Sequence, residues 1–380
     1  MADLVDTVTL SAQPFCLTFL TNTTFAAGLI TGSIELHSTT SPDDDGLTLI
    51  SRLTPFTSSV RCILSPSPSH LIAGSSTGEI VFINHSSPTS PQTQSFTATS
   101  LQKKTQTYPG ISSLLIPPSP PSLLLTGDDT GVIRLFPLTP TSLSSTPLLT
   151  LSHHTDYISK FLPHNSNVIA LSGDGTISYY DLTRPSPFIK RSDEQDDEFL
   201  SGCIIKSSKK VITGTQSGVL SIWGYGKWGD IENRLTGHPE SVDAMVKVDE
   251  NTVLTGSSDG LIRVVQVGPD KFLGVLGNHE GWSVEGIERS EDFRTVCSWS
   301  HDEKVRVWDG TLLMDDDDEE GEEIDTMKIV KEAEEGREEE SMDDEDDWED
   351  MEDSEEESDD GGGKPFAKLK TDEEKFFEDL

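Results

Sequence analysis

The chain has little cysteine, few basic residues and no long apolar run. Its cysteines, Cys16, Cys62, Cys203 and Cys297, are far apart and form no Cys-x-x-Cys pair, which argues against a zinc site or a disulfide scaffold. No stretch approaches the ~18–20 apolar residues that cross a bilayer, so we expect no membrane span. Lys and Arg number 28 against 67 Asp and Glu, and the formal net charge is −39. Such a chain is a poor ligand for nucleic-acid phosphates, and no sequence-specific nucleic-acid binding is expected.

The familiar catalytic motifs are also absent. The sequence contains no Gly-x-x-x-x-Gly-Lys-Ser/Thr loop, no Gly-x-Gly-x-x-Gly opening a helix, no His-Glu-x-x-His and no Gly-x-Ser-x-Gly. Its acidic tract lacks the ligand spacing of a calcium loop. The sequence therefore predicts a protein that is not an enzyme and that holds no metal or cofactor.

The distribution of charged residues divides the chain into two parts. Residues 1–314 carry 33 acidic and 21 basic side chains, whereas residues 315–380 carry 34 and 7. So acidic a segment buries too little apolar surface to offset the entropy of ordering. We predict a folded domain at 1–313, a disordered acidic linker at 314–363 and a short docking peptide at 364–380.

Two kinds of candidate site lie in this C-terminal region. Phe376, Phe377 and Leu380 would share one face of a helix that begins with the capping-box spacing of Thr371 and Glu374, so they form the candidate docking contact. Ser341 and Ser354 have an acidic residue three positions later and suit an acidophilic kinase. Phosphorylation would add ~1.5–2 negative charges at each serine.

The folded part repeats one pattern seven times. A short apolar run leads to a Gly-like position, a turn and then a strand of alternating apolar and polar residues, as in Ala27-Gly28-Leu-Ile-Thr-Gly32-Ser-Ile-Glu-Leu36. The Gly-like position recurs at residues 28, 74, 127, 171, 214, 256 and 299. A period of ~40–45 residues with four strands per unit is typical of β-propellers. The sequence thus predicts an all-β fold with seven four-stranded blades.

The two ends of the repeat array predict how the ring closes. Residues 4–10 alternate as a strand before the first copy begins, and after Asp309 only Gly-Thr-Leu-Leu precedes the acidic residues. The last unit therefore lacks its outer strand. We expect residues 4–10 to supply it beside residues 304–309, which removes an exposed sheet edge.

The repeats resemble the WD-repeat family. The last copy contains Trp308-Asp309, and Gly237-His238 matches the Gly-His element of the family. The resemblance implies a structural hydrogen-bond network of His, Ser or Thr, Asp and Trp. In the seventh copy this network would contain His279, Ser298 or Ser300 (Ser300 is our choice), Asp302 and Trp308. The sixth copy offers His238, Ser257 and Asp259, with Val265 in place of Trp, and the fourth offers His154, Asp174 and Tyr180.

The complete layout narrows the resemblance. Seven repeats, an acidic linker that contains Trp348 and a terminal Phe-Phe-Glu-Asp-Leu resemble the WD repeat-containing protein 55 family. That resemblance implies a place in the nucleus and nucleolus and a role in ribosome production. The chain departs from the expected Lys/Arg-rich C-terminal run, of which Lys364, Lys368 and Lys370 are a sparse version.

The favoured function is a non-catalytic interaction scaffold in nucleolar ribosome biogenesis, in rRNA processing and large-subunit assembly. Its expected partners are basic proteins (ribosomal proteins or assembly factors) and pre-ribosomal particles, within which the chain would be a monomer. A substrate receptor of a cullin-type ubiquitin ligase is one alternative, although Trp308-Asp309 is not followed by the Arg of a Trp-Asp-x-Arg motif. A histone-binding chaperone is the other.

Overall fold

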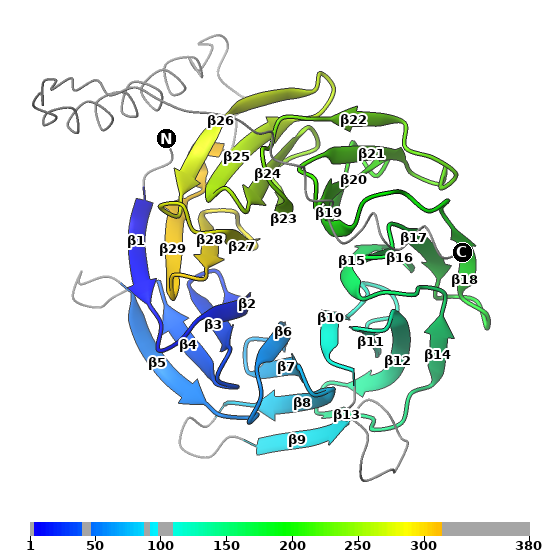
Figure 1. Cartoon of the computed structure of the whole chain (residues 1–380). Helices are drawn as coiled ribbons and strands as arrows, with labels where there is room; N and C mark the ends of the chain where they lie inside the picture. Colours follow the sequence, from blue (N-terminus) through cyan, green and yellow to red (C-terminus); the bar gives the residue numbers. More distant parts are fainter. Residues whose placement is uncertain (1–3, 40–46, 87–91, 98–108, 314–380) are drawn as a thin grey trace, which may run out of the picture. The chain divides into compact units, whose positions relative to one another are not determined.

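The strands form seven antiparallel sheets that stand around a common axis as the blades of a β-propeller (Figure 1). This computed structural model describes residues 4–39, 47–86, 92–97 and 109–313. The predicted all-β, seven-bladed fold is confirmed. Within the described ranges no helix is long and apolar enough to cross a bilayer.

Blades 1 to 3 come from the first part of the chain. Blade 1 contains β2 (Pro14–Thr21), β3 (Thr24–Leu29), β4 (Ile34–Ser38) and β5 (Thr48–Leu53). Blade 2 contains β6 (Val60–Ser67), β7 (His70–Ser75), β8 (Glu79–Asn84) and β9 (Gln92–Thr97). Blade 3 contains β10 (Ile111–Leu115), β11 (Leu123–Asp128), β12 (Val132–Thr139), β13 (Ser142–Leu143) and β14 (Leu149–Ser152).

Blades 4 to 7 follow in the same order. Blade 4 contains β15 (Ile158–His164), β16 (Asn167–Ser172), β17 (Ile177–Asp181) and β18 (Phe188–Arg191). Blade 5 contains β19 (Phe199–Ile205), β20 (Lys210–Thr215), β21 (Leu220–Gly224) and β22 (Asn233–Leu235). Blade 6 contains β23 (Val242–Lys247), β24 (Thr252–Ser257), β25 (Leu261–Gln266) and β26 (Lys271–Asn278). Blade 7 contains β27 (Val284–Arg289), β28 (Thr295–Ser300), β29 (Lys304–Asp309) and β1 (Leu4–Thr9), and one 3-10 turn, η1 (Thr311–Leu313), follows it.

Blade 3 departs from the predicted four strands. The first half of its long strand β12 pairs with β14, and the second half pairs with the two-residue strand β13. The outer position of this blade is therefore shared by two strands. The prediction of four strands per blade is wrong here because β12 extends beyond the sheet and forms its own hairpin with β13.

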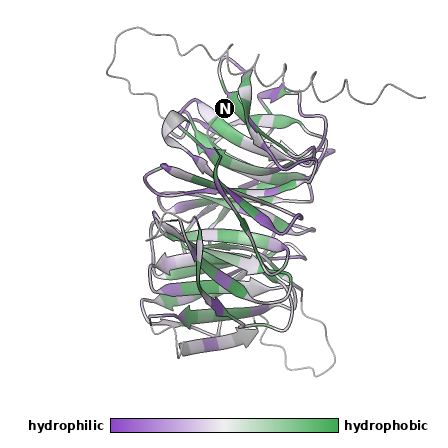
Figure 2. Cartoon of the chain, turned by 90° about the vertical axis from the view of Figure 1, so that its left-hand side faces the viewer, coloured by the Kyte–Doolittle hydropathy of each residue, from purple (hydrophilic) through white to green (hydrophobic). Residues whose placement is uncertain are grey.

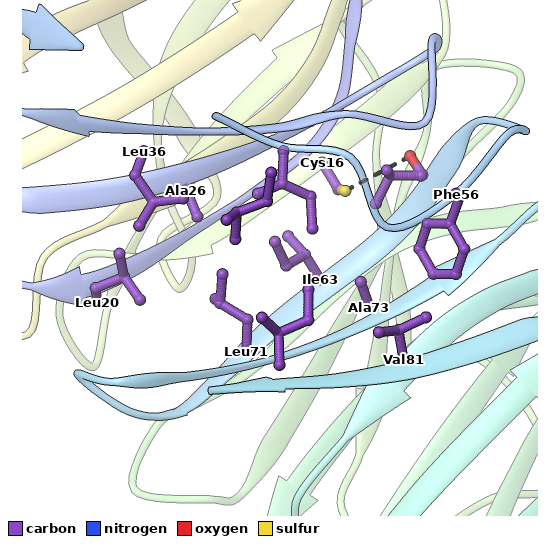
Figure 3. Close-up of a cluster of buried hydrophobic side chains, with 13 residues drawn as sticks. Cys16, Leu20, Ala26, Leu36, Phe56, Ile63, Leu71, Ala73 and Val81 are labelled. Carbon is purple, nitrogen blue, oxygen red and sulfur yellow. Dashed lines mark hydrogen bonds between the residues drawn. The ribbon is translucent and has the colours of Figure 1, made fainter. Parts of the chain in front are cut away.

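The hydrophobic core is divided among the interfaces between blades. Seven separate clusters of buried side chains each join two neighbouring blades. The cluster between blades 1 and 2 contains Leu36 on one side and Ile63 and Leu71 on the other (Figure 3). Because both faces of a blade are covered, strands inside the sheet such as β3 and β7 read as near-continuous apolar runs. Figure 2 shows hydrophobic residues along the strands of the ring.

The N-terminal strand closes the ring as predicted. β1 pairs antiparallel with β29, from Leu4 opposite Trp308 to Thr9 opposite Lys304. The Leu10 N–H then donates to the Glu303 carbonyl at 2.8 Å, and Leu10 is buried in the cluster between blades 7 and 1. The first and last repeats are thus joined by backbone pairing and by a shared core.

The turn between the second and third strands of each blade has one backbone position in the left-handed region. In blades 1 to 6 it is occupied by Gly, with φ between 70° and 85°, at residues 32, 78, 131, 175, 218 and 260. In blade 7 the position belongs to Glu303, with φ 61°. A residue with a Cβ is strained in this region by about 1–2 kcal/mol, whereas Gly is not.

We therefore expect Glu303→Gly to stabilise the propeller. The relief of strain exceeds the extra entropy of a glycine in the unfolded chain, so the free energy of unfolding should rise by about 0.5–1 kcal/mol. Urea denaturation, read from the midpoint at constant m-value, measures this change. Gly260→Ala is the matched control in blade 6 and should lower the midpoint; a lower midpoint for Glu303→Gly would contradict the prediction.

Candidate functional site

Blade 7 contains the most complete of the predicted networks. His279 lies fully buried in the connection between β26 and β27, and its Nε2 lies 2.7 Å from Ser298 Oγ. Trp308 Nε1 donates to the same oxygen at 2.9 Å. Three segments of the blade are thereby joined at one serine.

The serine of this network is Ser298, and our choice of Ser300 is wrong. Ser298 lies opposite Arg306 in the β28–β29 ladder, one diagonal step from Trp308. Ser300 lies two residues farther along β28, and its buried hydroxyl has no hydrogen-bond partner among the described residues. Spacing alone did not separate the two serines because both point to the same face of the strand.

An arginine that the sequence analysis missed lies between His279 and Asp302. Arg306 NH1 donates to Asp302 Oδ2 at 2.8 Å and also contacts His279 Nδ1, whereas the distance from His279 Nδ1 to Asp302 Oδ2 is 3.8 Å. Because a guanidinium only donates, Nδ1 accepts and Nε2 carries the proton that is donated to Ser298. Arg134 and Arg263 occupy the same position in repeats 3 and 6, a signal that was readable in the sequence.

Blade 6 has a similar but divided arrangement. His238 Nε2 lies 2.9 Å from Thr255 Oγ1, so Thr255 takes the position that we predicted for Ser257. Asp259 pairs with Arg263 through both carboxylate oxygens, at 3.0 and 2.6 Å. Although burial raises the pKa of Asp259, its hydrogen bonds with Arg263 lower the pKa below the ordinary value.

Blade 4 joins the predicted histidine and aspartate directly. His154 Nδ1 lies 3.3 Å from Asp174 Oδ2 and 3.0 Å from Thr176 Oγ1, and the Thr155 N–H donates to Asp174 at 2.9 Å. Burial alone would raise the pKa of Asp174, but these hydrogen bonds hold it well below its usual range. Tyr180 lies outside this network, with its hydroxyl 3.4 Å from His153 Nδ1.

Three further blades contain polar networks that the sequence analysis missed. In blade 5, Trp223 Nε1 donates to Thr213 Oγ1 at 3.2 Å, and in blade 3 the fully buried Asp128 accepts from Arg134 at 2.5 Å. In blade 1, the carboxylate of Glu35 is only 2 % exposed and accepts from Ser11 Oγ at 2.5 Å, from Arg52 Nε at 2.9 Å and lies 3.1 Å from His37 Nε2. Since Ser11 follows the closing strand, this last group ties the ring closure to blade 1.

These arrangements are structural in their chemistry. The predicted histidines are buried and hydrogen-bonded within their blades, and in the described part of the chain no three or more His, Cys, Asp or Glu side chains are placed to hold a metal ion. The four cysteines are free and buried, and burial raises the thiol pKa of both Cys62 and Cys203 to about 12. Thiols with so high a pKa are poor nucleophiles.

The buried histidines predict a loss of stability in mild acid. Burial and the neighbouring guanidinium, Arg263 for His238 and Arg306 for His279, lower each pKa to about 4, whereas an unfolded histidine has a pKa of about 6.5. The unfolded chain then binds more protons, so the contribution is complete above pH ~6.5 and is lost as the pH falls towards ~4. We expect each histidine to contribute about 2–3 kcal/mol to this loss.

Urea denaturation between pH 7 and pH 4 measures this effect. Carboxylates also titrate at the lower end, so the informative quantity is the difference between the wild type and His238→Gln. The variant should show a slope of stability against pH that is smaller by about one proton between pH 6.5 and 4.5. Parallel curves would mean that His238 has the same pKa in the folded and the unfolded protein.

The other predicted sites lie outside the described residues. They are the acidic linker at 314–363, the peptide at 364–380, the docking residues Phe376, Phe377 and Leu380, and the phosphorylation sites Ser341 and Ser354.

Comparisons with known proteins agree with the fold and the repeats. The chain is 41 % identical over 202 residues to "WD repeat-containing protein JIP5" of Cryptococcus neoformans, covering 52 % of this chain and 53 % of the relative. It is 33 % identical over 205 residues to "WD repeat-containing protein 55" of Rattus norvegicus (53 % and 52 %) and 33 % identical over 197 residues to the "WD repeat-containing protein 55 homolog" of Dictyostelium discoideum (52 % and 47 %). The aligned region thus spans about half the length of these curated relatives, and no protein-family model matches. The chain is therefore similar to WD-repeat proteins, WD repeat-containing protein 55 among them, and its folded part is a seven-bladed β-propeller.

Proposed function

We propose that this protein is a non-catalytic scaffold in nucleolar ribosome biogenesis, acting in rRNA processing and large-subunit assembly. The observation that carries the proposal is that buried polar side chains of the ring form hydrogen bonds with one another. His154, His238 and His279 are engaged in hydrogen bonds within blades, and the thiols are buried. What the protein offers to other molecules is surface and charge.

The negative sign of the net charge indicates which class of partner the protein binds. With a net charge of −39, the chain attracts basic proteins, and such attraction speeds association and depends on salt. Ribosomal proteins and the basic factors that assemble with them have this chemistry. The nuclear and nucleolar location follows from the resemblance to the WD repeat-containing protein 55 family. Within the larger complex we expect this chain to be a monomer.

Affinity purification of the tagged full-length protein tests the proposal. Ribosomal proteins and pre-rRNA that co-sediment with the bait as pre-ribosomal particles are the expected result, together with nucleolar fluorescence of the tagged protein. Recovery of a cullin adaptor, or of histones without pre-rRNA, would replace the proposal with one of the two alternatives.

Salt separates the two contributions that we expect from the C-terminal region. Ala at Phe376, Phe377 and Leu380 should weaken binding to pre-ribosomal particles equally at low and high salt, because an apolar contact is not screened. Neutralising acidic residues of 315–360 should weaken it mainly at low salt. Co-sedimentation of both variants at the wild-type level would assign the function to the propeller alone.

A further inference from the structure

One exposed tryptophan stands out on the surface of the ring. Trp282 is 53 % exposed. The other large apolar side chains that are exposed in the described part of the chain are aliphatic. It lies in the connection between β26 and β27, on the segment that also carries the buried His279. The Trp282 N–H donates to the His279 carbonyl at 3.0 Å, so the backbone beneath the indole is anchored in the network of blade 7.

The neighbouring segments of blades 6 and 7 meet at this point. The His279 N–H donates to the carbonyl of Gly260, in the β24–β25 turn, at 2.8 Å. Ser283 Oγ lies 3.2 Å from Ser258 Oγ, which in turn donates to Asp243 at 2.8 Å. Trp282 therefore lies on a surface that three connected segments hold in place.

Carboxylates lie on the segments that adjoin the tryptophan. Glu280 is 70 % exposed and lies 3.4 Å from Arg306, and Glu285 lies 3.2 Å from His301. Asp243 accepts hydrogen bonds from Ser241 and Ser258, at 2.9 and 2.8 Å. Burial raises the pKa of Asp243, and these hydrogen bonds and the charge of His301 offset that effect only in part.

The cations of the same region do not balance these acids. Arg306, which is buried, and Arg263, which is partly buried, form ion pairs with Asp302 and Asp259, and these carboxylates offset their charge. His301 and Lys304 remain beside the surface. The face around Trp282 thus combines an accessible indole with carboxylates in excess.

We propose that the Trp282 surface, formed by Trp282, Asp243, Glu280 and Glu285, docks an arginine-bearing basic segment of a partner protein. An arginine side chain suits both features, because its guanidinium stacks on an indole and binds carboxylates in bidentate geometry. Exposed Trp residues are also frequent anchors of protein interfaces. The inference rests on the proposed function, which expects basic partner proteins. The Trp282 surface would be the site on the propeller where such a partner docks.

Direct binding of a defined probe to the full-length protein tests this inference. The probe is a fluorescein-labelled peptide of alternating Arg and Gly, and anisotropy is recorded in about 0.3 M salt, where distant exposed charges are screened. We expect Trp282→Ala to weaken binding about 10-fold or more. Glu280→Gln/Glu285→Gln should weaken it several-fold, and Leu148→Ala, which removes a 70 % exposed side chain in blade 3, should not change it.

Several results would overturn the inference. These are unchanged binding by Trp282→Ala, a loss with Trp282→Ala but none with the two glutamine substitutions, and equal binding of the probe with Lys or Glu in place of Arg. Circular dichroism melting of each variant confirms that the propeller is folded, as the exposure of Trp282 leads us to expect. Unchanged probe binding by Trp282→Ala, while the wild type still co-purifies with pre-ribosomal particles, overturns the inference alone. Tryptophan-dependent probe binding without such particles overturns the proposed function alone.

Discussion

Asp302→Ala should lower the free energy of unfolding by about 3–5 kcal/mol, because it removes the carboxylate that pairs most closely with a buried arginine. Arg306 is 4 % exposed, and Asp302 accepts its NH1 at 2.8 Å and the Lys304 N–H at 3.0 Å. From the sequence alone, as an unsatisfied hydrogen-bond partner, the same substitution would cost about 1–3 kcal/mol. The structure raises this expectation because a buried charge, and not only a neutral donor, loses its carboxylate, and the exposed Glu280, 3.4 Å from Arg306, replaces it only in part.

A double-mutant cycle distinguishes the charge effect from general damage to the turn. Asp302→Ala/Arg306→Met removes both charges and retains apolar volume, so it should recover much of the stability that the single variant loses in urea denaturation. Asp309→Ala is the matched control. Asp309 accepts bonds from Thr311 at the end of the same strand, is only partly buried, and should cost less than about 1 kcal/mol. A melting temperature unchanged by Asp302→Ala would make Asp302 an ordinary turn residue.

Deletion of residues 1–10 should have the largest effect, because it opens the ring. It removes the β1–β29 pairing and the buried side chain of Leu10. The burial of Leu10 is worth about 1.5–3 kcal/mol and each lost ladder hydrogen bond about 1 kcal/mol, so the total should reach about 5 kcal/mol or more. The free edge of β29 should also promote association between molecules.

Urea denaturation and size-exclusion chromatography measure these two effects. A synthetic peptide of residues 1–10 added to the truncated protein should restore part of the stability, because it can refill the outer position of blade 7 and return the Leu10 side chain to the core. Deletion of residues 1–3 alone, which leaves β1 intact, serves as the control. A truncated protein as stable and monomeric as the wild type would mean that β1 is dispensable for closure.

The blades and their order could be predicted from the sequence because they depend on local patterns. Each turn requires a Gly or Asp at a set distance from two strands of alternating apolar and polar residues. This combination of turn and strands recurs every ~40–45 residues. Closure by residues 4–10 followed from counting strands. His154 and Asp174 were paired correctly because both belong to one copy of the repeat and lie at its two turns.

Only the tertiary structure decided which polar side chains meet. Ser298 replaces Ser300, and Thr255 replaces Ser257, because the register of the strand ladder and the depth of the histidine decide the contact. Arg306 lies between His279 and Asp302. Glu35 accepts hydrogen bonds from Ser11 and Arg52, which lie on two other segments. The sequence alone thus determined the number of blades and how the ring closes, through turn chemistry and strand periodicity. The polar networks and the acidic surface beside Trp282 depend on tertiary packing, which places polar groups far apart in the sequence within hydrogen-bonding distance.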